Sequence, residues 1–147
     1  MAKIVELWNK EELPIKDGVY FSSGKSIAIS ISTYPDLVIE KGSEFDLEGF
    51  LNEGPEEITN IDIMQKVTVN DKFQCFLGEG SHGSEGFIAY LTIGGELEWV
   101  MYFEQSNPFV KVVKLSNETI EVESSANYKL IINVDEPENF IASSKIQ

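Results

Sequence analysis

The chain has 147 residues, a common size for one domain with one core, and its 42% hydrophobic and 24% charged residues are typical of a folded protein. It has 25 acidic residues and 11 basic ones, all lysines, so the formal net charge is -14. An acidic chain without arginine is not expected to bind DNA, RNA or an anionic membrane surface directly, whereas its charge favours encounters with a basic protein.

The sequence shows no pattern typical of a targeting signal, and no linker divides it into domains. Residues 1–14 lack the apolar run of a signal peptide, and no later stretch is as long and apolar as a membrane span. We therefore expect a cytoplasmic protein in which residues 1–147 form a single β-rich domain. Cys75 lies within the apolar run FQCFL, which favours a buried thiol over a nucleophile.

The first half of the chain gives mixed signals. Residues 3–13 fit either a short helix that ends before Pro14 or an edge strand, and 47–51 fit a short helical turn. Ile27, Ile29 and Ile31 alternate with small residues, as in a half-buried strand. Further strands are predicted at 19–22, 37–40, 58–64, 66–69 and 72–77, the last two joined by a turn at 70–71.

The second half reads as a series of strands. Runs rich in Val, Ile, Phe, Tyr and Trp alternate with short connectors of turn residues, which is typical of a β-meander. The predicted strands are 86–93, 96–104, 109–115, 119–124 and 128–134. The expected fold is mainly β, with antiparallel meander or sandwich-like sheets and at most one or two short helices.

The hairpin at Gly94-Gly95 allows a prediction of register. A two-residue type I′ turn there, with both glycines at positive φ, pairs Tyr90 with Trp99 and Phe87 with Tyr102. Alternation then places Ile88, Tyr90, Leu97, Trp99, Met101 and Phe103 on one face, and Phe87, Ala89, Leu91, Val100 and Tyr102 on the other. Because both faces are apolar, we expect a second sheet, a helix or a partner to cover each of them.

No pattern in the chain predicts a catalytic, metal or cofactor site. The only histidine, His82, lies in the loop GEGSHGSEG beside Ser81 and Ser84, and an exposed loop residue is the simpler interpretation. The loop's glycines precede a predicted strand and two of its residues are acidic, so it does not resemble a phosphate-binding loop. We expect these glycines to provide unusual backbone angles.

The acidic segment, residues 36–62, stands out. It contains nine acidic residues and one lysine, which gives a net charge of -8. One interpretation is a solvated surface that keeps the protein soluble, and the other is a docking face for a basic partner, with Phe45, Phe50 and Leu51 as apolar anchors. The candidate partner-binding residues are Glu40, Glu44, Asp46, Glu48, Glu53, Glu56, Glu57 and Asp62.

Residues 78–112, GEGSHGSEGFIAYLTIGGELEWVMYFEQSNPFVKV, resemble a pattern in small bacterial cytoplasmic immunity proteins, which protect a cell against its own polymorphic or contact-dependent toxins. The resemblance covers about a quarter of the chain and includes no catalytic residue. It implies a stoichiometric binder of the toxin–antitoxin kind that covers the active site or a regulatory face of a basic nuclease toxin.

Three functions remain open at this point. The first is a non-enzymatic protein-binding domain, such as an immunity protein that neutralises a basic bacterial toxin by occlusion. The second is a small-ligand or carbohydrate-binding β-domain that uses Tyr90, Trp99 and Tyr102. The third is an enzyme of a type that the sequence does not reveal.

Overall fold

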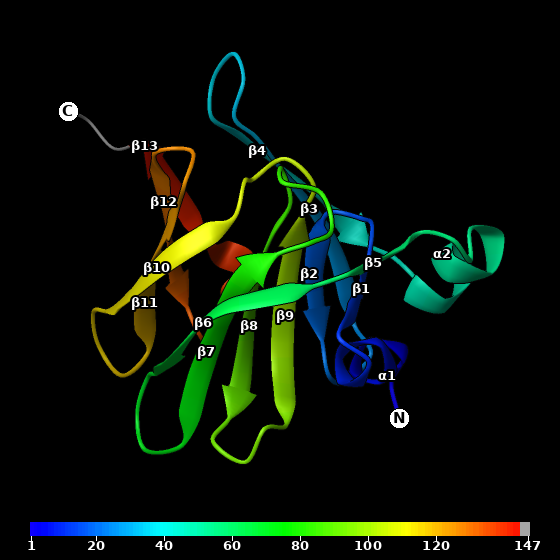
Figure 1. Cartoon of the computed structure of the whole chain (residues 1–147), viewed down its shortest axis with the longest axis horizontal. Helices are drawn as coiled ribbons and strands as arrows, with labels where there is room; N and C mark the ends of the chain where they lie inside the picture. The colour runs from blue at the N-terminus through cyan, green and yellow to red at the C-terminus, as the bar shows by residue number, and fades with distance from the viewer. Residues whose placement is uncertain (145–147) are drawn as a thin grey trace.

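The computed structural model of the chain describes residues 1–144 (Figure 1). In this part of the chain, thirteen strands form three antiparallel sheets, accompanied by two short α-helices and one 3-10 helix. The prediction of a mainly β fold with at most two short helices is therefore confirmed. None of the helices within these residues is long and apolar enough to cross a membrane.

The large sheet contains seven of these strands, in the spatial order β4 (Val38–Glu44), β3 (Ser26–Ser32), β2 (Gly18–Phe21), β9 (Leu97–Phe103), β8 (Gly86–Thr92), β7 (Phe73–Glu79) and β6 (Asp62–Thr68). The small sheet has the order β10 (Phe109–Lys114), β11 (Thr119–Ser124), β12 (Tyr128–Asn133) and β13 (Ile141–Ser144). A short pair joins β1 (Glu12–Pro14) to β5 (Ile58–Asn60). The helices are α1 (Lys3–Asn9), α2 (Leu47–Glu53) and the 3-10 helix η1 (Pro137–Asn139).

Apolar side chains cover both faces of the large sheet, as the hairpin predicted. One face packs against the small sheet, where Ile88, Trp99 and Met101 share a core with Val122 and Leu130. The other face packs against the two helices and the short pair. This second core contains Ile4, Leu7, Trp8, Leu13, Leu47, Leu51, Phe87, Val100 and Tyr102. In Figure 1 the small sheet lies at the left, with α1 at the lower right and α2 at the right.

The β8–β9 hairpin has the predicted register, but its turn differs. Tyr90 pairs with Trp99 and Phe87 with Tyr102. The loop has three residues instead of two, and only Gly95 of the two glycines has a positive φ, of 96°. An extra residue at Glu98 forms a bulge that restores the register. The bulge turns Leu97 to the helix-covered face, so its predicted face was wrong.

The predicted meander is interrupted where β9 ends. The next strand, β10, does not pair with β9 but begins the small sheet. The chain changes direction at Asn107, which has φ of 61°, and the carbonyl of Ser106 accepts hydrogen bonds from Ser124 Oγ at 2.6 Å and Tyr128 Oη at 2.9 Å. These buried hydrogen bonds fix the switch from one sheet to the other.

The two interpretations of residues 3–13 are both partly correct. Residues 3–9 form α1, which buries Ile4, Leu7 and Trp8, and Glu11 then reverses the backbone with φ of 57°. Residues 12–14 form an edge strand. The predicted strand 58–64 is two strands, because the chain breaks at Ile61 between β5 and β6.

Candidate functional site

The acidic segment passes through β4, α2 and β5 and ends at the start of β6. All eight candidate residues are exposed except Glu57, which is half-buried. Glu40 and Glu44 lie on β4, whereas Asp62 lies on β6 at the opposite edge of the large sheet. Because five strands separate those edges, the eight residues do not form one continuous face. The residues on and directly after α2 instead follow one another along one short stretch of the chain.

A side-chain cap and an apolar stripe position α2. Asp46 is the N-cap, and its Oδ1 accepts a hydrogen bond from Glu48 N at 3.2 Å. Leu47 and Leu51 are buried in the second core, one turn apart, while Glu48 and Glu53 are exposed. The helical turn predicted at 47–51 is thus confirmed, and it presents its carboxylates to solvent.

The predicted apolar anchors are mostly occupied within the chain. The Lys16 ammonium lies 4.9 Å from the centre of the Phe45 ring and 5.7 Å from that of Phe50, and Tyr20 contacts Phe45 edge-on at 5.8 Å. Leu51 is only 6% exposed. Neither phenylalanine is therefore a free anchor, and Leu51 offers only the edge of its side chain.

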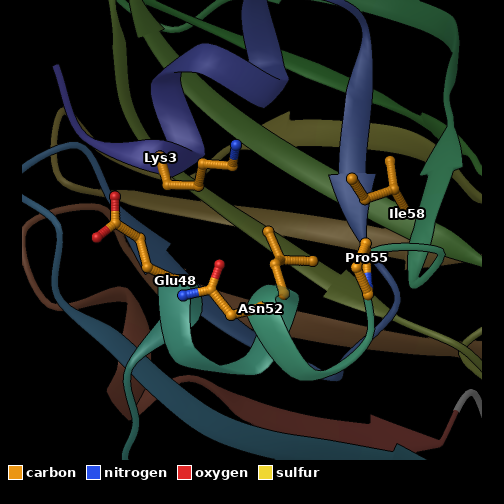
Figure 2. A pocket seen from close by; sticks show the side chains of 6 residues that line it. Lys3, Glu48, Asn52, Pro55 and Ile58 are labelled. Carbon is orange, nitrogen blue, oxygen red and sulfur yellow. The ribbon is translucent and has the colours of Figure 1, made fainter.

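A pocket of about 460 Å³ opens between α1 and α2 (Figure 2). Figure 2 shows Lys3 on the α1 side, Glu48 and Asn52 on α2, Pro55 on the segment that leads into β5, and Ile58 at the start of β5. Leu51 completes the lining. The pocket lining is therefore half apolar and half polar, and all of it except Lys3 comes from the acidic segment.

Two further hollows adjoin the acidic segment. One, of about 530 Å³, is lined by Glu40, Lys41 and Phe50 together with Asp17. The other, of about 410 Å³, is lined by Glu57, His82 and Glu85. Ile15 and Glu104 line both, so the two hollows are adjacent. The surface on this side of the protein is thus hollowed and rich in carboxylates.

Asp17 is the most perturbed carboxyl of this surface. Burial raises its pKa to about 6, helped by the neighbouring charge of Glu104, while hydrogen bonds from the backbone and the charge of Lys16 act in the opposite direction. Its Oδ1 accepts a hydrogen bond from Glu104 N at 2.7 Å. The carboxylate therefore connects the start of β2 to the end of β9.

Replacing Asp17 with Asn is expected to flatten part of the pH dependence of stability. Because the folded pKa lies above the usual value of 3.8, the folded chain binds more protons between pH 4 and 6, and its free energy of unfolding falls as the pH rises through that window. After allowance for the partial exposure of Asp17, the free energy of unfolding of the wild type falls by about 1–2 kcal/mol across this window.

Urea denaturation from pH 4 to 8 measures this difference. The Asn variant retains an oxygen acceptor for Glu104 N, so its stability relative to the wild type should improve steadily from pH 4 to 7. A wild-type and variant difference that does not change with pH would contradict the assignment.

Glu85 is a buried carboxylate that the sequence analysis missed. It is 3% exposed, and it accepts hydrogen bonds from the Tyr102 hydroxyl at Oε2 and from His82 N at Oε1, the latter at 2.8 Å. The His82 ring, whose side chain is 77% exposed, places Nδ1 3.5 Å from the same Oε1. The loop also contacts β5, because Ser81 Oγ lies 2.8 Å from Thr59 Oγ1.

Two of the loop's glycines, Gly80 and Gly86, serve close packing and not unusual backbone angles. A Cβ on Gly80 would lie 2.3 Å from Glu85 Oε1, and one on Gly86 would lie 2.3 Å from the carbonyl oxygen of Asn107. Neither residue has a positive φ. The prediction about their angles was therefore wrong: they leave room for the buried carboxylate and for the sheet switch.

The aromatic residues proposed for ligand binding lie in the interior. The rings of Tyr90 and Trp99 stack between the two sheets, with their centres 5.4 Å apart. The Trp99 indole N–H donates a hydrogen bond to the carbonyl oxygen of Val134 at 2.9 Å. Tyr102 faces the other core. All three are at most 4% exposed, so they present no surface on which a sugar or other ligand could stack.

Within residues 1–144, no three His, Cys, Asp or Glu side chains are grouped as metal ligands would be. Cys75 is fully buried in the first core, as predicted, and burial raises its pKa to about 12. Its thiol is therefore protonated at neutral pH and is a poor nucleophile.

Comparisons with known proteins give no match. No protein-family model matches the chain, and neither a curated protein nor a solved structure is significantly similar to it.

Proposed function

We propose that the chain is a non-enzymatic domain that binds a basic protein through the α2 acidic surface, defined here as Glu48, Glu53, Glu56 and Glu57. The partner that best fits this proposal is a nuclease-type toxin in the bacterial cytoplasm, which the chain would neutralise by occlusion as an immunity protein. The weak resemblance of residues 78–112 and the net charge of -14 both favour this function.

The observation that supports the proposal most is the unpaired state of the carboxylates around α2. In the part of the chain that the structure describes, no lysine or histidine lies within ion-pairing distance of Glu48, Glu53 or Glu56. By contrast, Glu44 pairs with Lys25 at 3.7 Å, and Asp46 is used as the cap of α2. Adjacent unpaired charges attract an oppositely charged surface and speed its association.

Capture from cells that naturally make this chain tests the proposal. Tagged wild-type chain should retain a basic protein at low salt, and a variant with Glu53, Glu56 and Glu57 changed to lysine should lose it. A control with Glu96, Glu118 and Glu136 changed to lysine has the same net charge but alters exposed sites outside α2. The proposal fails if no basic protein is retained, or if both variants retain it equally.

A further inference from the structure

The pocket between α1 and α2 has features that restrict what can enter it. Leu51 and Ile58 contribute aliphatic surface, and Pro55 adds a ring at one side. Leu51 is already nearly buried and Ile58 is half-buried, so a new apolar group placed there would extend the existing second core. This apolar part of the lining favours an aliphatic or aromatic side chain over a polar one.

The charges around the pocket differ between its two sides. Lys3 stands on the α1 side, and its ammonium disfavours a cation inside the pocket. Glu48 stands on the α2 side, and the chain continues from there to the exposed carboxylates of Glu53 and Glu56. Glu48 lines the same pocket as Lys3, so its carboxylate opposes the approach of a small anion to the Lys3 ammonium. Cationic groups are therefore favoured around the pocket and an uncharged apolar group within it.

We propose that this pocket receives an apolar side chain of the basic partner, flanked in the partner by lysine or arginine residues that contact the α2 acidic surface. The inference rests on the proposed function and adds the chemistry of the bound segment. It matches the usual anatomy of a binding hot spot, in which a central apolar anchor is surrounded by polar contacts that exclude water.

Synthetic peptides test the pocket separately from the electrostatic attraction. The probes are acetyl-Lys-Lys-Leu-Lys-Lys-amide, the same peptide with Ala in place of Leu, and acetyl-Glu-Glu-Leu-Glu-Glu-amide. Amide chemical shifts of the labelled full-length chain are recorded at low salt. The leucine peptide should shift amides within residues 46–58 and bind about tenfold more tightly than the alanine peptide, since only leucine buries a full apolar side chain.

A pocket-filling variant provides the structural control. Asn52→Phe changes an exposed residue that lines the pocket, so the variant should fold and should abolish the preference for leucine while leaving salt-dependent binding of both basic peptides. Asn117→Phe, at an exposed turn between β10 and β11, should retain the preference.

The outcomes separate the two proposals. Equal affinities for the leucine and alanine peptides in the wild type would overturn the pocket inference but leave charge-driven binding intact. Binding of the glutamate peptide in the pocket would contradict the inference that cationic groups are favoured around it. If neither basic peptide shifts residues 46–58, the pocket inference fails, and failure of the capture experiment as well would contradict the proposed function.

Discussion

Replacing Glu53, Glu56 and Glu57 with lysine is expected to slow association with the basic partner by about 10- to 100-fold at low ionic strength. The change replaces an attractive local potential with a repulsive one at the point of contact. Because salt screens charges that are exposed and more than about 10 Å apart, the difference should shrink as salt is raised towards physiological strength. Stopped-flow measurements with the captured partner at several salt concentrations give the rate constants.

The lysine control at Glu96, Glu118 and Glu136 makes this test specific. It changes the net charge by the same amount but should slow association far less, since the altered sites lie in turns away from α2. If both variants slow association equally, the net charge of the chain and not the α2 acidic surface steers the partner.

Replacing Tyr102 with Phe is expected to destabilise the fold by about 2–3 kcal/mol. The variant removes the hydroxyl that donates to Glu85 Oε2, and it leaves a carboxylate oxygen without that partner in a site that is 3% exposed. Urea denaturation at pH 7 measures the loss. Tyr34→Phe is the matched control. Tyr34 is 87% exposed, so loss of its hydroxyl should change the free energy of unfolding by less than about 0.5 kcal/mol.

A second variant identifies the charge of Glu85 as the cause. Adding Glu85→Gln to Tyr102→Phe should cost less than the sum of the two single changes, because the amide leaves no charge buried. Strictly additive losses would indicate that the two side chains stabilise the fold independently.

Local patterns predicted much of the fold. The alternation of apolar residues on both sides of Gly94-Gly95 gave the correct pairing of Tyr90 with Trp99 and the two covered faces. The predicted face of Leu97 was wrong. The three-residue loop and the bulge at Glu98 shift the strand pairing in opposite directions, so the register beyond the bulge is the predicted one. Leu97 lies between the two shifts and therefore points to the opposite face. Such compensation leaves little trace in the pattern of residue types.

Strand order could not be predicted in the same way. Whether two consecutive strands pair depends on distant segments, and the switch after β9 is held by hydrogen bonds from Ser124 and Tyr128 to the carbonyl of Ser106. The same limit applies to the acidic segment. Its charge was evident, but the placement of Glu40 and Asp62 at opposite edges of the large sheet follows from pairings across the whole chain.

Glu85 could have been found from the sequence. The predicted pairing of Phe87 with Tyr102 places Glu85, two residues earlier, on the same face and diagonal to Tyr102. A carboxylate diagonal to a tyrosine on an apolar face predicts a buried hydrogen bond. The nearby glycines then have a reason, since Gly80 gives the carboxylate the space it occupies.

Hydrogen exchange of the chain, alone and in complex with the captured basic protein, tests the central claim most directly. We expect slower exchange of amides on and around α2, within residues 46–58, and little change in the β10–β11 turn. Protection confined to the small sheet, with exchange around α2 unchanged, would contradict it.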